Sequence, residues 1–190
     1  MKEFIRPSEK GAKKTVPQSV AEIRKRARAN VEDGAVTEGY RADRENVIKL
    51  LNETLATELV CVLRYKRHYY MASGIHAQTA ADEFLEHANM EQTHADRVAE
   101  RIVQLGGAPD LNPDTLTKRS HAEYIEGSTV MDMLRENLVA ERIAIESYTD
   151  FIRYIGDDDP TTRRLLEDIL AVEEEHADDI KTLMERFDEV

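Results

Sequence analysis

Two stretches of the sequence place a glutamate and a histidine three residues apart, in a pattern that can bind a metal ion. The first contains Glu91 and His94, and the second contains Glu173 and His176. Residues i and i+3 of a helix share one face, about 60° apart around the axis. A carboxylate and a neutral imidazole so placed can hold one cation together. A single pair of this kind is common on solvated helices, but the second copy, 82 residues later and again followed by alanine, indicates a built site.

A glutamate on each of two further segments extends the pattern. Glu58 is followed seven residues later by Tyr65, and Glu141 is followed seven residues later by Tyr148, 83 residues along the chain. The two halves of the chain therefore form an internal repeat, in which each half supplies one lone Glu and one Glu-x-x-His pair. Two such repeats packed about a pseudo-twofold axis would bring four carboxylates and two imidazoles together. That donor set is typical of a two-metal site.

Four long amphipathic helical patterns carry these residues near their middles. In each pattern apolar residues recur every three or four positions, and the glutamate occupies a position on the apolar stripe. An ionised carboxylate in an apolar core is very unfavourable unless it is paired or bound to a cation. The helices are expected over residues 43–73, 79–105, 129–155 and 160 to near the end, with a shorter one over 20–32.

The lengths of the connections predict how the four helices are arranged. The first two helices, and the last two, are joined by about five and four residues, which makes each pair antiparallel neighbours. The segment from Gly107 to Gly127 is long enough to run the whole length of a bundle. The sequence therefore predicts an all-α four-helix bundle with a long crossover between its second and third helices.

Composition excludes several other classes of protein. The chain has 190 residues, 34% of them charged, with only 8 Gly and 5 Pro, which disfavours turn-rich β folds. The single cysteine, Cys61, excludes an intrachain disulfide and a cysteine-only zinc site. No apolar run reaches the ~20 residues of a membrane span. We expect a soluble, cytoplasmic protein in which Cys61 is a packed small side chain.

Charge is distributed unevenly along the chain. The formal net charge is −12, but residues 1–28 carry nine basic and three acidic groups, so the remaining residues carry −18. We expect residues 1–42 to form a basic N-terminal arm with a short helix, and residues 43–190 to form the bundle. Such an arm could bind the phosphates of a nucleic acid, or it could pack on a neighbouring subunit.

The doubled motif resembles the ferritin-like di-iron carboxylate family, in which two helices each supply a Glu and two others each supply Glu-x-x-His. The resemblance spans residues 44–188 and is nearest to bacterioferritins and to Dps-like proteins with the same kind of site. It implies two iron ions in each subunit, with Glu91 and one partner bridging them. The six implied ligands are Glu58, Glu91, His94, Glu141, Glu173 and His176.

Three neighbours of these ligands have expected supporting roles. By the same resemblance Tyr65 lies near the di-iron site, and Tyr148 is its repeat mate. Each hydroxyl is expected to hydrogen bond to a carboxylate across the bundle. Asn137, one turn before Glu141, is predicted to accept a hydrogen bond from a ligand imidazole.

Two departures from bacterioferritins bear on the cofactor and on assembly. Bacterioferritins have a haem-ligating methionine directly after the second-helix Glu, whereas this chain has Gln92, so we expect no haem. Only 14 residues follow His176, which leaves nothing for the short fifth helix of 24-subunit cages. Together with the basic arm, this favours a Dps-like shell of twelve subunits. A 24-subunit cage or a dimer stays open.

The resemblance implies a ferroxidase that oxidises Fe(II) with O₂ or H₂O₂ and stores the ferric product. One alternative is a rubrerythrin-like peroxidase with two iron or two manganese ions and no storage. Another is a Dps-like protein that protects DNA through residues 1–28.

The remaining charged groups and histidines are interpreted as structural or as parts of an assembly. The basic cluster of Arg64, Lys66, Arg67 and His68 is expected on a solvated or interface face. Asp157–Asp159 is expected to form a polar turn that could face a metal-entry channel. Three histidines are interpreted as ordinary or as lining a pore of an assembly: His76, His87 and His121.

Overall fold

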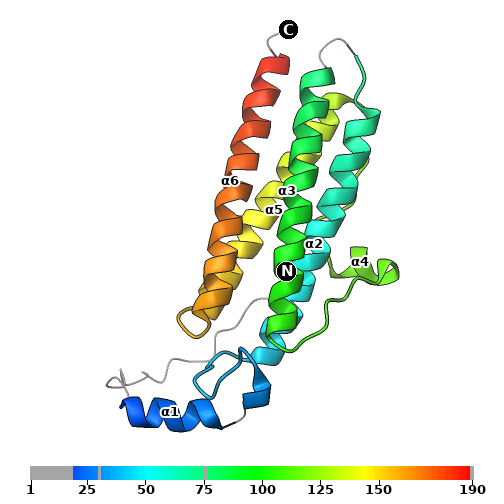
Figure 1. Cartoon of the computed structure of the whole chain (residues 1–190). Coiled ribbons are helices and arrows are strands. Elements are labelled where there is room, and N and C mark those ends of the chain that lie inside the picture. Colours follow the sequence, from blue (N-terminus) through cyan, green and yellow to red (C-terminus); the bar gives the residue numbers. More distant parts are fainter. Residues whose placement is uncertain (1–18, 30, 75–76, 189–190) are drawn as a thin grey trace.

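The computed structural model describes residues 19–29, 31–74 and 77–188, and the regular structure of these residues is entirely helical (Figure 1). Four long helices form a bundle in which α2 pairs with α3 and α5 pairs with α6. Their bounds lie within a few residues of the predicted ones, so the predicted four-helix bundle is confirmed. The four are α2 (Arg44–Met71), α3 (Ala77–Gln104), α5 (Val130–Ile155) and α6 (Pro160–Asp188).

Local sequence explains where the helices of the bundle begin and end. The Asp43 carboxylate accepts a hydrogen bond from the Asn46 amide and caps α2. Thr129 and Asp132 form a reciprocal capping box at the start of α5. Such caps satisfy amides that have no partner within the helix. Gly156 ends α5 with a φ of 53°, a conformation that residues with a side chain seldom adopt.

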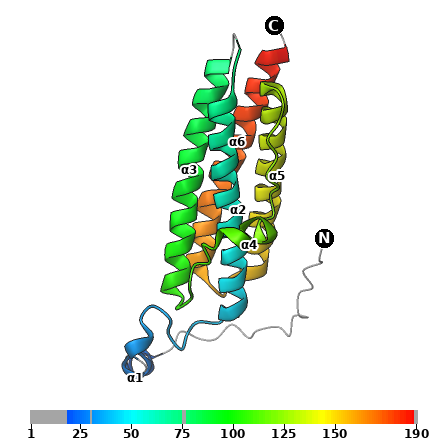
Figure 2. The ribbon, with the colours of Figure 1, turned by 90° about the vertical axis from the view of Figure 1, so that its right-hand side faces the viewer.

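A short helix, α1 (Val20–Arg28), precedes the bundle and lies beyond one end of it (Figures 1 and 2). Ser19 and Glu22 form its capping box, and none of its residues is buried. The helix ends four residues earlier than predicted, and a 3-10 turn follows at Val31–Asp33. Residues 1–18 of the predicted arm lie outside the described residues.

The apolar core is divided into two clusters along the bundle, and the lone glutamates lie between them. One cluster occupies the end of the bundle where α2 begins and includes Leu55. The other occupies the opposite end and includes Cys61 and Tyr65. Glu58 lies between these two clusters on α2, and the glutamate of each other long helix lies between them in the same way. The bundle therefore has a polar layer enclosed by two apolar ones.

The crossover from α3 to α5 runs beside α2, as Figure 2 shows, and contains α4 (Pro113–Arg119). Successive residues of the crossover contact successive parts of α2. Arg119 donates to the carbonyl of Asn52, and the His121 amide donates to Thr57 Oγ1, each at 2.9 Å. The long crossover predicted from the sequence is therefore present and is attached along α2. No helix in the described part of the chain is long and apolar enough to cross a membrane.

The Arg64 side chain is buried, so the predicted placement of the Arg64–His68 basic cluster on an exposed face is wrong for two of its members. Arg64 Nε donates to Asn137 Oδ1 and Nη1 donates to the Glu123 carbonyl, both at 2.9 Å. The His68 ring lies between Asn137 Oδ1 and the Ile125 carbonyl, at 3.2 and 3.1 Å. These contacts join α2, α5 and the crossover. Lys66 is exposed, as predicted.

Asn137 is consequently not a partner of a candidate ligand. Its Oδ1 accepts from Arg64 and faces His68, and neither residue belongs to the predicted metal site. The predicted hydrogen bond from a ligand imidazole to Asn137 is wrong. The reason is that Asn137 lies one turn before Glu141 on α5, near the crossover. There the buried Arg64 donates a hydrogen bond to its Oδ1.

A buried ion pair connects α3 to α6 at the other end of the bundle. Arg101 Nη2 contacts both carboxylate oxygens of Asp159, at 3.0 and 3.1 Å. The same carboxylate accepts from the amide and the hydroxyl of Thr162 and from the hydroxyl of Tyr40. Asp159 is 2% exposed. It is therefore a structural residue and does not face an entry channel, whereas its neighbours Asp157 and Asp158 are exposed.

We expect Asp159→Ala to lower the free energy of unfolding by about 3 kcal/mol, because it leaves the buried Arg101 guanidinium without its counter-charge. The matched change Asp158→Ala removes an exposed carboxylate from the same turn and should cost less than about 0.5 kcal/mol. Chemical denaturation of the metal-free protein measures both values. Equal losses for the two variants would contradict this role of Asp159.

Candidate di-metal centre

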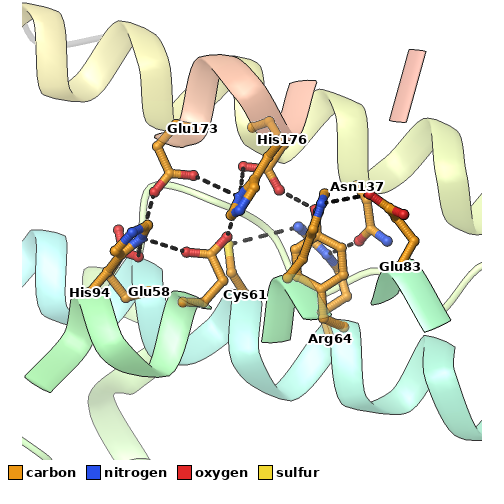
Figure 3. A network of polar contacts seen from close by, with 12 residues as sticks. Glu58, Cys61, Arg64, Glu83, His94, Asn137, Glu173 and His176 are labelled. Carbon is orange, nitrogen blue, oxygen red and sulfur yellow. Dashed lines mark hydrogen bonds and ion pairs between the residues drawn. The ribbon is translucent and has the colours of Figure 1, made fainter. Parts of the chain in front are cut away.

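The six predicted ligands meet at mid-bundle, in the polar layer between the two apolar clusters. Figure 3 labels Glu58, His94, Glu173 and His176 among them. Each of the four long helices supplies one glutamate, and α3 and α6 each add a histidine one turn later. The structure thus brings together the two halves of the sequence repeat. All six residues are at most 3% exposed: Glu58, Glu91, His94, Glu141, Glu173 and His176.

The six residues form two overlapping groups of four. One group contains the carboxylates of Glu58, Glu91 and Glu173 with His94, and each residue has a ligand atom within 4.8 Å of the others. The second group contains Glu91 and Glu173 again, now with Glu141 and His176. Glu91 and Glu173 therefore belong to both groups. Such sharing is what two bridging carboxylates between two cations require.

The two histidines point their Nδ1 atoms at these carboxylates. His94 Nδ1 lies 2.9 Å from Glu173 Oε1, 3.3 Å from Glu91 Oε2 and 3.4 Å from Glu58 Oε2. His176 Nδ1 lies 3.6 Å from Glu173 Oε2 and 3.7 Å from Glu91 Oε1. Each imidazole thus faces one group of carboxylates.

Many buried polar atoms of the centre accept or donate no well-aligned hydrogen bond within the described part of the chain. They include one oxygen each of Glu58, Glu91 and Glu141, both oxygens of Glu173 and both ring nitrogens of His176. Buried polar atoms nearly always have a hydrogen-bond partner, so a group of several without one requires an explanation. Two divalent cations fit this donor set, because they would neutralise four carboxylates and use the free lone pairs.

Burial and mutual contacts shift the pKa values of Glu58 and His94 in the direction that retains protons. Burial and the neighbouring Glu91 carboxylate raise the pKa of Glu58 to about 8. Burial alone would lower the pKa of an imidazole. Contacts with Glu173, Glu58 and Glu91 outweigh that effect and raise the pKa of His94 to about 12. Burial and Glu173 would raise the pKa of Glu91, but contacts with His176 and His94 outweigh them and lower it. Without metal, Glu58 and His94 are therefore mostly protonated at neutral pH, whereas Glu91 is not.

Two tyrosines hold the carboxylates that are not shared, and they do so across the bundle. Tyr148 on α5 donates to Glu58 Oε1 on α2, at 2.6 Å. Tyr65 on α2 donates in turn to Glu141 Oε1 on α5. The predicted hydrogen bonds between the tyrosines and the carboxylates across the bundle are therefore present. Each leaves the second oxygen of its carboxylate free to face the centre.

His87 was missed as a neighbour of the centre, although a signal for it existed in the sequence. It is 1% exposed, and its ring stacks on that of His176 with 3.9 Å between centroids. His87 Nδ1 lies 3.2 Å from the Tyr65 hydroxyl. His87 precedes Glu91 by four residues, which places both on one face of α3. The interpretation of His87 as an ordinary or pore-lining histidine is wrong.

Gln92 and Cys61 take no part in the centre. The Gln92 amide donates to Asp96 on the outer side of α3, at 2.9 Å. The absence of haem that Gln92 implies stays a prediction. Cys61 is buried, as predicted, and burial raises the pKa of its thiol well above the usual value.

Comparisons with known proteins agree with this architecture. Bacterioferritin of Desulfovibrio desulfuricans is 32% identical over 141 residues, which cover 73% of this chain and 74% of the relative. Bacterioferritin of Mycobacterium avium is 28% identical over 151 residues, which cover 76% and 87%.

Solved structures show the same fold. A dodecameric thioferritin, the bacterioferritin-related protein from Bacteroides fragilis, has a TM-score of 0.73 at 30% identity, over 77% of this chain and 90% of that one. The Desulfovibrio desulfuricans bacterioferritin has a TM-score of 0.69 at 25% identity, over 79% and 86%. The ferritin-like domain family itself matches residues 48–190. The chain therefore belongs to the ferritin-like family.

Proposed function

We propose that this protein is a ferroxidase that binds two Fe(II) ions at the six-residue centre and oxidises them with O₂ or H₂O₂. The observation that carries the proposal is the pair of overlapping four-ligand groups that share Glu91 and Glu173. Similarity to bacterioferritins supports iron as the metal. Carboxylate oxygens and imidazole nitrogens also suit iron in both oxidation states, whereas a thiolate site would favour softer ions.

The side chains of the centre and its surroundings supply negative charge, orient the ligand atoms and exclude water. Four carboxylates balance the charge of two Fe(II) ions, and each ion that is oxidised gives up one electron to the oxidant. Tyr148 and Tyr65 hold Glu58 and Glu141 by one oxygen, so each carboxylate presents its other oxygen to a cation. The apolar clusters on both sides exclude water and strengthen these electrostatic interactions.

We expect the double variant Glu91→Ala/His94→Ala to lose rapid aerobic Fe(II) oxidation. The change removes one shared carboxylate and one imidazole, so neither four-ligand group stays complete. Stopped-flow absorbance at two Fe(II) per chain measures the rate, which should fall to that of Fe(II) in buffer. The matched control Gln92→Ala/Thr93→Ala alters the two intervening residues of α3, which lie outside the centre, and should keep the wild-type rate. An unchanged rate in the first variant would contradict the assignment.

Metal binding should stabilise the protein more at pH 8 than at pH 6. In the metal-free protein Glu58 titrates at about pH 8, above its ordinary value, so below that pH a cation must displace its proton. The raised pKa values of Glu58 and His94 also mean that these two groups bind more protons in the folded metal-free protein than in the unfolded chain. Their contribution to stability is therefore present at low pH and falls as pH rises above their unfolded pKa values.

Thermal melts with and without Co(II) at pH 6, 7 and 8 measure this dependence. The rise in melting temperature caused by Co(II) should grow with pH, and Glu91→Ala/His94→Ala should show a smaller rise than the wild type at each pH. If the increase in melting temperature caused by Co(II) becomes smaller from pH 6 to pH 8, the carboxylates of the centre do not retain protons in the metal-free protein.

Storage distinguishes the ferroxidase from a peroxidase without an iron core. The similarity to a dodecameric thioferritin and to bacterioferritins supports assembly of this chain, and we propose a shell of twelve subunits. Aerobic iron loading followed by mass measurement separates the alternatives. Hundreds of irons per assembly indicate storage, whereas two or three metal ions per chain, iron or manganese, indicate a peroxidase.

DNA binding through residues 1–28 stays a prediction. Within the described part of this segment, α1 exposes Arg24, Lys25 and Arg28. A gel shift that weakens with rising salt, and that disappears when residues 1–28 are removed, would support it. An unaltered shift at high salt, or no shift, would exclude it.

A further inference from the structure

A second cluster of ligand-type side chains continues outward from the di-metal centre. Glu83, His87 and Asp179 each have a ligand atom within 4.8 Å of the other two. Exposure increases across the cluster: His87 is buried, the Glu83 side chain is 28% exposed and Asp179 is exposed. In Figure 3, Glu83 lies beyond His176, on the side away from His94. The cluster therefore lies between the buried centre and solvent.

Helical periodicity explains why the cluster adjoins the centre. On α3 the ligand-type residues recur every four positions, and on α6 they recur every three, so each set forms a row along one face. The two helices contact each other and run in opposite directions, so both rows lead away from the centre toward the same end of the bundle. The rows are Glu91, His87 and Glu83 on α3, and Glu173, His176 and Asp179 on α6.

The His87 ring is held with one nitrogen directed into the cluster. Its stack on His176 and the contact of Nδ1 with the Tyr65 hydroxyl restrain the ring. Because the Tyr65 hydroxyl donates to Glu141, its oxygen is left to accept from His87 Nδ1. Nε2 then carries a lone pair, and it lies 3.1 Å from Glu83 Oε1 without a hydrogen-bond partner.

A lone pair that faces a carboxylate oxygen is repulsive unless a cation or a proton lies between them. Burial and the carboxylates of Asp179 and Glu86 also raise the pKa of Glu83, which shows that negative charge accumulates there. His176 and Arg186 act in the opposite direction, but neither Glu83 nor Asp179 forms an ion pair with a lysine or arginine among the described residues. Two carboxylates and an imidazole nitrogen without a fixed counter-charge match the donor set of a divalent cation.

We propose that Glu83, His87 and Asp179 form a third divalent-cation site, separate from the six-residue centre, that takes Fe(II), Co(II), Mn(II) or Zn(II). The ion is held by one oxygen from each carboxylate and by His87 Nε2, with water in the remaining positions because Asp179 is exposed. Its role as a loading position for the centre rests on the proposed ferroxidase function. Binding of the cation does not.

Titration of the metal-free protein with Co(II), followed by calorimetry and visible absorbance, tests the site. The wild type should bind three Co(II) per chain, and Glu83→Gln/Asp179→Asn should bind two. The control Asp82→Asn/Asp178→Asn removes the same charge from the adjacent, exposed positions of the same helices and should bind three. Equal numbers for the wild type and Glu83→Gln/Asp179→Asn would overturn the proposal, and so would the loss of an ion in the control.

A variant without both shared carboxylates, Glu91→Ala/Glu173→Ala, separates this proposal from the proposed function. It should still bind one Co(II), and the addition of Glu83→Gln/Asp179→Asn should abolish that binding. If this variant binds one Co(II) but the wild type does not oxidise Fe(II), the ferroxidase proposal is refuted and the third site is kept. If the wild type oxidises Fe(II) but the variant binds no Co(II), the third site is refuted and the ferroxidase proposal is kept.

The loading role has its own measurement. At Fe(II) concentrations well below saturation, Glu83→Gln/Asp179→Asn should oxidise Fe(II) several-fold more slowly than the wild type, and saturating Fe(II) should restore the rate. A reduced rate at all Fe(II) concentrations would show that the variant damages the centre, and an unchanged rate would show that ions bypass the site. Either result would overturn the loading role.

Discussion

The constraint on which the rest of the structure depends is the burial of four carboxylates in one layer of a helical bundle. Ionised groups lose their hydration there, and two imidazoles cannot offset four negative charges. The metal-free chain reduces the repulsion by retaining protons, as the raised pKa values of Glu58 and His94 show. Cations that enter the layer replace those protons. The stability of this core and its metal chemistry are therefore two aspects of one electrostatic problem.

The internal repeat solves the problem of holding these carboxylates in place. Each lone glutamate is followed by a tyrosine two turns later on the same helix. That tyrosine is too far along the helix to contact this glutamate, and it bonds instead to the lone glutamate of the other half of the repeat. Tyr148 holds Glu58 and Tyr65 holds Glu141, which makes the support reciprocal between α2 and α5. The crossover adds a second attachment, because Arg64 connects α2 to Asn137 of α5 and to the Glu123 carbonyl. The unshared ligands thus have positions that are fixed before a metal binds.

Periodicity and spacing predicted the helices, the crossover and the meeting of the six residues, because these depend on which face of a helix a residue occupies. They did not predict the partners of Arg64 and Asp159. Arg64 belongs to a run of basic residues that is typical of a solvated surface, yet it is buried and donates to Asn137 of α5 and to the Glu123 carbonyl of the crossover. Asp159 belongs to an acidic turn, yet Arg101 reaches it from another helix. In each case a contact with a residue distant in sequence buries a side chain that the local pattern predicts to be exposed. Such a contact cannot be predicted from a single sequence.

His87 shows a different limit, since its helical register with Glu91 was visible and only its exposure was unknown. Once its burial is known, the same three- and four-residue spacing that assembles the centre extends beyond it on both α3 and α6. A centre whose ligands are at most 3% exposed needs a route by which ions reach it, and an apolar wall would oppose their passage. Side chains that offer one ligand atom after another along two facing helices would lower that barrier. The same periodicity that buries the proposed metal centre therefore also places the proposed third site between it and solvent.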